Sequence, residues 1–184
     1  MLFPEIENFK GKVIEIHGSP DSGKTKAILR YIKHIQDSFN STTFYLDADN
    51  ALQNMGEFSK LDHSRIWLTF SMNENVIYQI PSIMKNVDLF VLDNFTIYPK
   101  KPWRFLSELH NMAKKYKTAV ILVNQCRCVL NHKTGKFEDK PYRYNIIQKY
   151  CDAAIDWDNQ TIDVFRKEEN IVLDNTLLDL LSLV

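Results

Sequence analysis

Residues 12–25 read KVIEIHGSPDSGKT, and this stretch decides the fold of the chain. Residues 12–17 alternate β-branched with other side chains, which predicts a strand. Residues 24–37 carry apolar side chains at helical spacing, which predicts a helix close behind it. Residues 18–25, which link the predicted strand to the helix and include its first two residues, fit G-x-x-x-x-G-K-[ST] in the strand–loop–helix setting that this pattern requires. We therefore expect a phosphate-binding loop.

The residues of this loop have the chemistry that a phosphate chain requires. Gly18 and Gly23 let the backbone curl without Cβ clashes, so that successive N–H groups and the helix N-terminus face an anion. The Lys24 side chain reaches the β and γ phosphates, and the Thr25 hydroxyl can ligate Mg²⁺. The pattern therefore predicts ATP and Mg²⁺ as cofactors. The expected binding residues are Gly18, Ser19, Pro20, Asp21, Ser22, Gly23, Lys24 and Thr25.

The rest of the chain alternates strands with helices, which predicts an α/β fold with a mostly parallel central sheet flanked by helices. We expect one domain over residues 1–184, ending in an antiparallel hairpin. Pro81 should end or kink the second helix. The expected strands are 42–47, 66–70, 87–93 and 118–123, the further helices 74–85 and 102–116, the hairpin 153–157 with 161–166, and a long loop 126–145. The secondary structure of the Leu-rich residues 170–184 is left unassigned, and their last part, residues 177–184 (LLDLLSLV), is either a core element or a docking segment.

Acidic residues near the predicted strands are candidates for the metal site. Asp93 ends a buried strand, where a carboxylate is costly unless a cation or hydrogen bonds compensate it, so it is the expected Mg²⁺ partner. A helix N-cap or turn role is the alternative. Asp88 lies at the start of the same strand, away from the edge where parallel sheets bind ligands.

Two further polar pairs follow predicted strands. Asp47 and Asp49 lie where one carboxylate can orient or deprotonate a water, although ordinary Asx-turn chemistry explains such a motif more often. Asn124 and Gln125 either sense a γ-phosphate through hydrogen bonds or cap the end of their strand. Spacing alone does not choose between these roles.

Composition sets the class of protein. The chain has 184 residues, 45% hydrophobic residues and a net charge of zero, which disfavours intrinsic disorder. The apolar runs are far too short to span a membrane, and the N-terminus has no secretory pattern. Three cysteines are too few for a disulfide framework. We expect a cytoplasmic, or at least intracellular, protein without membrane partners.

The charge is unevenly distributed along the chain. Residues 100–149 hold twelve basic and three acidic residues, a net charge of +9, against −3 before and −6 after them. Such a segment can attract a polyanion. A solvated helix face together with a loop explains the same charge equally well.

Five segments, taken in order, resemble the RecA recombinase family, in its bacterial and phage branch. They are residues 12–25 (KVIEIHGSPDSGKT), 44–52 (FYLDADNAL), 87–100 (VDLFVLDNFTIYPK), 119–127 (AVILVNQCR) and 144–157 (YNIIQKYCDAAIDW). Order and approximate spacing agree from about residue 10 to about residue 167. The resemblance implies a RecA-like P-loop ATPase core that hydrolyses Mg-ATP, binds single-stranded DNA and serves homologous recombination or DNA repair.

The resemblance also implies roles for single residues. Lys24 and Thr25 hold the phosphates and Mg²⁺, and Asp93 belongs to the Mg²⁺ site. Asp49 stands where the family has the glutamate that activates water. Gln125 stands where the family couples the γ-phosphate to a DNA-binding loop. The implied catalytic residues are therefore Lys24, Asp49 and Gln125.

Residues 126–145 correspond to that DNA-binding loop. Basic side chains that follow a backbone, with aromatic ones between them, hold single strands without sequence preference. The aromatic residues are Phe137, Tyr142 and Tyr144. The implied DNA-binding residues are Arg127, Lys133, Lys136, Lys140, Arg143 and Asn145.

The sequence also departs from the family. Asp49 is one methylene shorter than glutamate, and Arg143 and Tyr144 replace a glycine pair. The first DNA-binding loop is shortened near residues 99–102, and the N-terminal assembly element and the additional C-terminal domain have no counterpart. These departures leave an alternative, a non-catalytic ATP-binding paralog that docks on a recombinase or repair partner. An unrelated P-loop kinase for small molecules is the third possibility, which the Asn–Gln pair and the basic segment disfavour.

Overall fold

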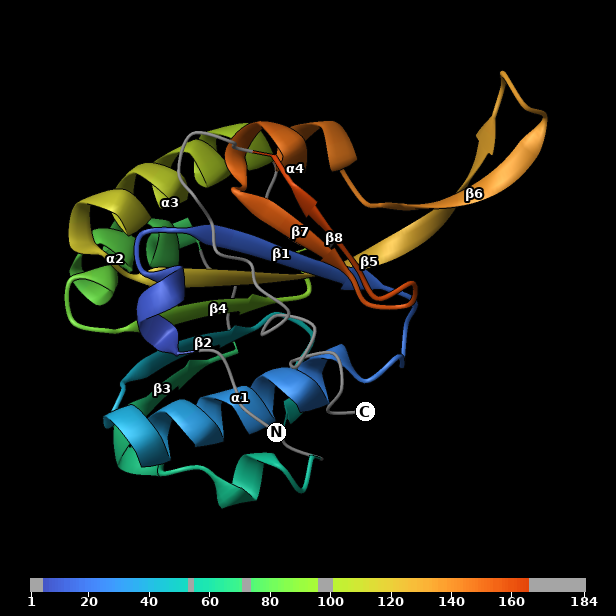
Figure 1. Ribbon diagram of the computed structural model, residues 1–184. Helices are drawn as coiled ribbons and strands as arrows, with labels where there is room; N and C mark the ends of the chain where they lie inside the picture. Colours follow the sequence, from blue (N-terminus) through green and yellow to red (C-terminus); the bar gives the residue numbers. More distant parts are fainter. Residues whose placement is uncertain (1–4, 53–54, 71–73, 96–100, 166–184) are drawn as a thin grey trace.

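The computed structural model describes residues 5–52, 55–70, 74–95 and 101–165. Within them, eight strands form one sheet, in which seven follow the order β3-β2-β4-β5-β1-β7-β8 and β6 pairs with β5 off this path (Figure 1). The strands are β1 (Val13–Gly18), β2 (Thr43–Asp47), β3 (Ile66–Thr69), β4 (Leu89–Asp93), β5 (Ala119–Asn131), β6 (Lys136–Pro141), β7 (Ala153–Asp156) and β8 (Thr161–Val164).

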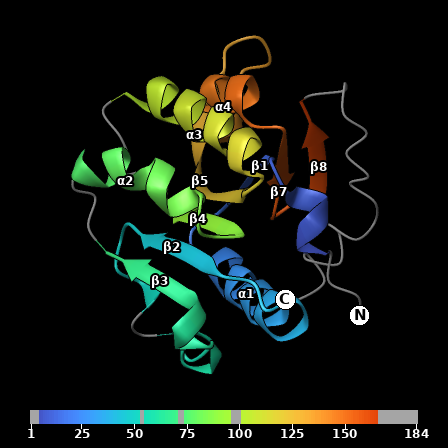
Figure 2. The ribbon, with the colours of Figure 1, turned by 90° about the vertical axis from the view of Figure 1, so that its left-hand side faces the viewer.

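Helices cover both faces of the sheet. Figures 1 and 2 show α1 on one face and α2, α3 and α4 on the other. The helices are α1 (Lys24–Phe39), α2 (Glu74–Met84), α3 (Pro102–Tyr116) and α4 (Tyr144–Tyr150), with short 3₁₀ turns at Ile6–Phe9, Phe58–Lys60 and His63–Arg65. Two apolar clusters follow from this layering. One joins α1 to side chains of β1 and β5, and the other joins α2 and α3 to the opposite faces of β4 and β5.

The parallel pairing brings polar residues to one edge of the sheet. β1 runs parallel to β5 and to β7, so that Gly18 lies opposite Gln125. β2 runs parallel to β4, and Asp47 lies opposite Asp93. Because the carboxyl ends of parallel strands share an edge, the phosphate loop, the acidic residues and the amide pair converge there.

The predicted elements are confirmed within one or two residues over most of the described chain. The hairpin of β7 and β8 is antiparallel, as expected. Of the two expected effects of Pro81, ending the helix is wrong, because α2 continues through it to Met84. The other, a kink, stays a prediction. Ile80 and Met84 are both buried against the core, and this packing holds the last turn together despite the proline.

The prediction of a long loop at residues 126–145 is wrong. β5 continues to Asn131, and β6 pairs with it in antiparallel fashion from Lys136 to Pro141. α4 then begins at Tyr144, so Asn145 lies in a helix. Figure 1 shows this hairpin projecting from the body of the protein, and we call residues 126–142 the arm. Since much of both faces of the arm is exposed, it shows no alternation of apolar and polar residues to reveal its strands.

Two sequence-based expectations fall outside the described residues. They are the tail, residues 170–184, and the shortened DNA-binding loop near residues 99–102, of which 99 and 100 are not described. In the described part of the chain, no helix has the length and apolar character needed to cross a membrane.

Candidate nucleotide site

The phosphate loop leaves β1 at Gly18 and enters α1 at Lys24. Gly23 has φ 92°, a left-handed conformation that glycine adopts without steric cost. Gly18 is required for a different reason. A Cβ there would lie 3.0 Å from Asp158 Oδ1 and 3.1 Å from Trp157 Cβ. In this motif, Gly23 therefore allows the backbone to turn, and Gly18 allows close packing against the turn between β7 and β8.

Lys24 folds back over this loop. Its Nζ donates hydrogen bonds to the carbonyls of Gly18 (3.1 Å) and Ser19 (2.6 Å) and to Ser22 Oγ (3.1 Å). Burial lowers the pKa of Lys24, while the charge of Asp158, among others, opposes that shift. The ammonium group is therefore held at the loop and largely desolvated, where it interacts strongly with an anion.

Thr25 meets the predicted metal-site aspartate. Its Oγ1 donates to Asp93 Oδ2 at 2.9 Å, and the Tyr45 hydroxyl donates to the same oxygen at 2.6 Å. Asp93 is only 4% exposed. Burial raises the pKa of Asp93, while the hydrogen bonds from Tyr45 and Thr25 counteract the increase. A nearby cation would stabilise this buried carboxylate.

The hydroxyl and carboxylate oxygens of Thr25 and Asp93 suit a hard cation such as Mg²⁺. No group of three or more His, Cys, Asp or Glu side chains among the described residues is placed to hold a metal ion. That finding is compatible with magnesium at this position, because Mg²⁺ in nucleotide sites takes one or two protein ligands and completes its shell with phosphate oxygens and water.

Asp47 and Asp49 have different roles. Asp47 is fully buried and accepts the N–H groups of Ala51 at 3.1 Å and Leu52 at 2.9 Å, so it stabilises the turn after β2. Asp47 thus has the Asx-turn role, which was the alternative to orienting or deprotonating a water. Asp49 is exposed to the cleft described below, and its Oδ2 accepts a hydrogen bond from Asn94 Nδ2 at 3.0 Å. Asp49 is thus the carboxylate of the pair that faces the candidate site.

These residues line one cleft of about 320 Å³, which is within the range typical of small-molecule sites. It gathers all three residues expected to be catalytic, Lys24, Asp49 and Gln125, and both expected metal ligands. The lining residues are Pro20, Asp21, Ser22, Gly23, Lys24, Thr25, Lys26, Asp49, Ala51, Met55, Asp93, Asn94, Val123, Asn124 and Gln125. Gly18 and Ser19 form the root of the loop and are not among them.

Asn124 and Gln125, the amide pair at the end of the predicted strand, make different contacts. Asn124 is fully buried, and its Nδ2 donates to Glu15 Oε1 at 2.8 Å and to the Tyr142 carbonyl at 2.9 Å. Its Oδ1 accepts the backbone N–H of Gln125 at 3.0 Å. Asn124 therefore ties β1 to the base of the arm, and both Asn124 and Gln125 line the cleft.

His17 extends this buried network. Its Nδ1 lies 2.7 Å from Glu15 Oε2, and its Nε2 lies 3.9 Å from Asp156 Oδ2. Burial alone would lower the pKa of His17, but the hydrogen bond and charge of Glu15, assisted by Asp156, raise it above its usual value.

The turn between β7 and β8 contributes two contacts that sequence reasoning missed. Asp158 Oδ2 accepts both the N–H and the hydroxyl of Ser19, each at 2.6 Å. Trp157 Nε1 donates to the Ser22 carbonyl at 2.7 Å. The turn thus holds the phosphate loop at both ends. The one sequence signal for these contacts was the position of the hairpin beside the predicted sheet.

The residues expected to bind DNA lie apart from the cleft, on the arm and at its base. Cross-strand pairing places Arg127 opposite Lys140 on one face. Lys136, four residues from Lys140 along β6, is on the same face, and Glu138 lies between them and pairs with Lys140 at 3.3 Å. The other face carries Leu130 opposite Phe137, whose ring is 73% exposed. Lys133 lies in the turn at the tip. The first face is therefore mostly basic, and the second carries the exposed ring of Phe137 together with Asp139.

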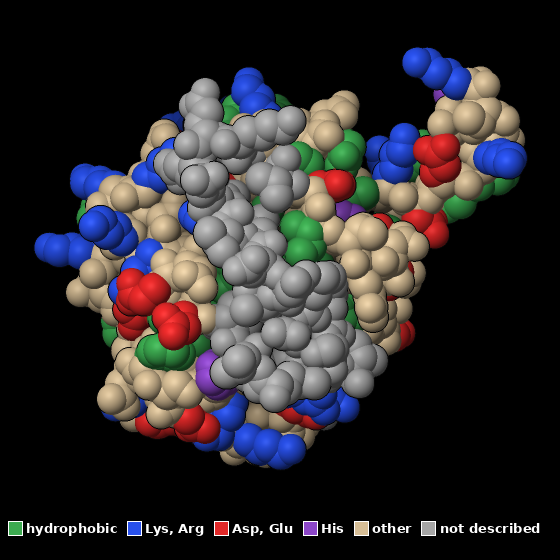
Figure 3. Space-filling model, viewed as in Figure 1, with side chains coloured by type: hydrophobic (Ala, Val, Ile, Leu, Met, Phe, Trp, Pro, Cys, Tyr) green, Lys and Arg blue, Asp and Glu red, His purple; other side chains and the backbone are tan. Residues whose placement is uncertain are grey.

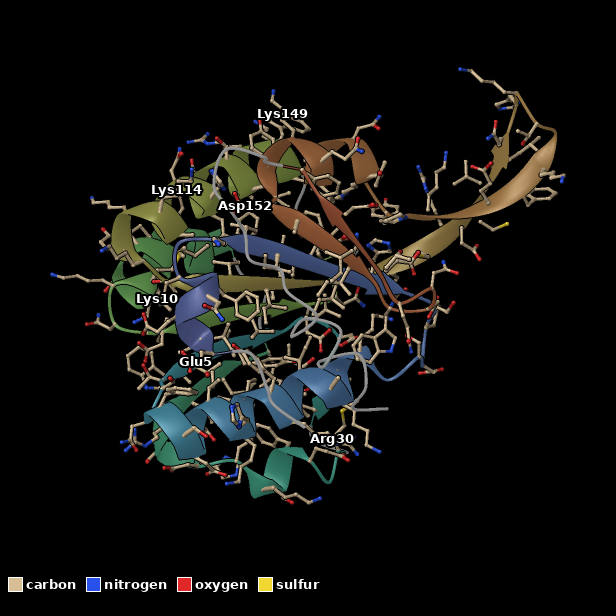
Figure 4. All side chains as sticks on the ribbon, viewed as in Figure 1. Glu5, Lys10, Arg30, Lys114, Lys149 and Asp152 are labelled. Carbon is tan, nitrogen blue, oxygen red and sulfur yellow. The ribbon has the colours of Figure 1, made fainter. Side chains whose placement is uncertain are left out.

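The positive segment of the sequence is divided between two regions. Figure 3 shows Lys and Arg side chains along the projecting arm. Lys114 and Lys149, in contrast, belong to α3 and α4, in the helical layer opposite α1 (Figure 4). The positive charge therefore lies partly on a helical layer and partly on the arm.

No family model matches the chain, and no curated protein is significantly similar to it.

Proposed function

We propose that this chain is a RecA-like P-loop ATPase that hydrolyses Mg-ATP and binds single-stranded DNA in recombination or repair. One observation carries the proposal. The phosphate-loop hydroxyl of Thr25 contacts the strand-end carboxylate of Asp93 at 2.9 Å in the cleft that also holds Lys24 and Asp49. P-loop NTPases use the same combination of Ser/Thr, strand-end Asp and Lys around their nucleotide.

The chemistry follows from the positions of these groups. Loop N–H groups and Lys24 bind the phosphate chain, and Thr25 with Asp93 would hold Mg²⁺. When bound, the ion supplies charge neutralisation at the β and γ phosphates. Asp49 accepts a proton from the attacking water or orients that water. Gln125, from the adjacent strand, donates a hydrogen bond toward the γ-phosphate.

The arm supplies a surface for a nucleic-acid strand. Its basic face attracts phosphates in a salt-dependent manner. Two contacts connect the base of the arm to the cleft. Asn124 bonds the Tyr142 carbonyl, and the Arg143 guanidinium lies 5.7 Å from the ring centre of Phe95, two residues after Asp93. These contacts support a coupling between DNA binding and turnover.

The first test is ATP turnover with and without single-stranded DNA. Wild-type protein should show DNA-stimulated turnover, and Lys24→Ala should abolish it. DNA binding is measured in parallel by fluorescence anisotropy over a range of salt concentrations. The double variant Arg127→Ala/Lys140→Ala should weaken binding and reduce the salt slope by about 0.7 per lost phosphate contact.

The control for the arm is Lys114→Ala/Lys149→Ala, which removes the same charge from α3 and α4. It should leave DNA affinity nearly unchanged. Equal losses in both double variants would mean that net charge, rather than the arm, attracts the DNA. Absence of turnover at any DNA concentration would refute the ATPase function of the isolated chain.

One observation favours a second candidate, the non-catalytic paralog. The carboxylate of Asp49, which faces the cleft, is one methylene shorter than the glutamate that the resemblance would place there. In this second proposal the chain binds ATP without hydrolysing it and docks on a recombinase, another repair protein or a further copy of itself. Tight nucleotide binding without turnover, together with turnover gained in Asp49→Glu, would support this candidate.

A further inference from the structure

We propose that Asn94 is a positioning residue that holds the Asp49 carboxylate in place to activate the water that attacks the γ-phosphate. This inference rests on the proposed ATPase function. It concerns a residue that neither the phosphate-loop motif nor the resemblance to RecA proteins marks.

Asn94 follows Asp93 directly at the end of β4 and lines the same cleft as Asp49 and Thr25. Asn94 is buried, with only 7% of its surface exposed. Its Nδ2 donates to Asp49 Oδ2 at 3.0 Å. The contact joins the carboxyl end of β4 to the turn after β2, which are segments 45 residues apart in sequence.

Chemistry determines which way the amide of Asn94 faces. An ionised carboxylate can only accept hydrogen bonds, so the Nδ2 group must be the one directed at Asp49. The orientation leaves Asn94 Oδ1 buried, with no hydrogen-bond partner among the described residues. A buried acceptor without a partner destabilises the folded state.

The backbone of Asn94 is also in an unfavourable conformation. Its φ is 64°, in the left-handed region that side chains other than glycine rarely adopt, although asparagine tolerates it better than most. Two destabilising features thus coincide at one residue beside the phosphate loop. Such features persist when the surrounding structure requires them, and they cluster at functional sites. Here the conformation gains the hydrogen bond to Asp49.

Asp49 needs such a contact because its side chain is exposed and lies on a turn. Without a donor, its carboxylate would sample several rotamers. A general base must lie within hydrogen-bond reach of the water that it activates, and small misplacements reduce rates severely. Asn94 therefore orients a carboxylate that is one methylene shorter than glutamate.

Asn94→Gly separates positioning from folding. Glycine adopts φ 64° freely and removes both the amide donor and the buried Oδ1, so the variant should fold with equal or higher melting temperature. The matched control is Asn40→Gly. Asn40 also has a left-handed φ, 54°, but it caps the far end of α1, away from the cleft.

The measurement that needs no turnover is calorimetric binding of Mg-ADP with and without aluminium fluoride. This complex mimics the γ-phosphoryl group under attack by a water. Wild-type protein and Asn40→Gly should bind the fluoride complex at least tenfold more tightly than Mg-ADP alone. Asn94→Gly should lose about tenfold of that preference while its affinity for Mg-ADP stays within twofold. Its kcat should fall by about tenfold with little change in KM.

A second comparison isolates the pathway through Asp49. In an Asp49→Ala background, Asn94→Gly should cause no further loss of preference for the fluoride complex. If Asn94→Gly keeps the wild-type preference and kcat, the positioning role is wrong while the ATPase proposal stands. If wild-type protein itself shows no preference for the fluoride complex, the site does not catalyse hydrolysis and both proposals fail.

Discussion

Replacing Tyr45 with phenylalanine removes one hydroxyl from beneath the candidate metal site and leaves the ring in place. Tyr45 is fully buried, and its hydroxyl donates to Asp93 Oδ2 at 2.6 Å. Burial, together with the charge of Asp93, raises the pKa of Tyr45, so the hydroxyl remains a donor. The substitution therefore takes one hydrogen bond from a buried carboxylate without creating a large cavity.

The magnitude follows from the type of bond. A hydrogen bond to a charged group contributes about 1.5–3 kcal/mol, so Tyr45→Phe should lower the free energy of unfolding by that amount near pH 7.5. For a chain of this size the melting temperature should fall by roughly 3–12 °C. The assay is urea denaturation followed by circular dichroism, supported by calorimetry.

The pH dependence has a definite sign. Burial already raises the pKa of Asp93, and loss of the Tyr45 donor raises it further. The variant is therefore destabilised most where Asp93 is ionised. The difference in stability between variant and wild type should narrow as pH falls and Asp93 becomes protonated.

Tyr31→Phe is the matched control. Tyr31 is also fully buried, but its hydroxyl has no hydrogen-bond partner among the described residues. Its removal should leave the free energy of unfolding unchanged or raise it, because a buried unsatisfied group is lost. Equal effects of Tyr45→Phe and Tyr31→Phe at pH 7.5 would refute the idea that Tyr45 supports a charged Asp93.

Three further predictions use the same region. Because Glu15 raises the pKa of His17, the stability that His17 contributes should be complete below about pH 6.5 and should be lost as the pH rises through the pKa of His17 in the folded protein. The free energies of unfolding of wild type and His17→Gln, measured by urea titration, should therefore differ less at pH 9 than at pH 6. The same difference at both pH values would contradict this. Gly18→Ala places a Cβ 3.1 Å from Trp157 Cβ, so it should destabilise the protein by about 1–3 kcal/mol. It should also weaken the affinity for ATP measured by calorimetry. An unchanged affinity would show that the turn between β7 and β8 moves to accommodate the Cβ. Trp157 bonds the Ser22 carbonyl, so ATP should change tryptophan emission in wild type but not in Trp157→Phe, and an equal change in both would exclude this reporter.

The loop between β1 and α1 and the position of Asp93 beside it could be predicted from sequence because their signals are local or follow from a general rule. Gly18, Gly23 and Lys24 are close together in the chain, and the strand before them and the helix after them are each visible in side-chain periodicity. Predicting the position of Asp93 required one further inference, which is that parallel strands place their carboxyl ends at the same edge of a sheet. The contact between Asp93 and Thr25 then follows from the strand order.

The arm could not be predicted, because both of its faces meet solvent. Periodicity reveals a strand when one face is buried, and no such constraint acts on residues 126–142. The same limit applies to contacts between distant segments. Trp157 and Asp158 lie about 140 residues from the loop they hold, and their sequence neighbourhood describes only a turn.

The sequence by itself determined the glycine-rich loop between β1 and α1, the alternation of strands and helices, and the residue types on which the proposed nucleotide and metal chemistry depends. These properties depend on short-range spacing and on the intrinsic chemistry of side chains. Only the tertiary structure decided that Asp47 stabilises a turn while Asp49 faces the cleft, that Asn94 holds Asp49, and that Asn124 ties the arm to β1. Those roles depend on which strand ends meet in space, because hydrogen bonds act over about 3 Å and carry no signature in the spacing of residues along the chain.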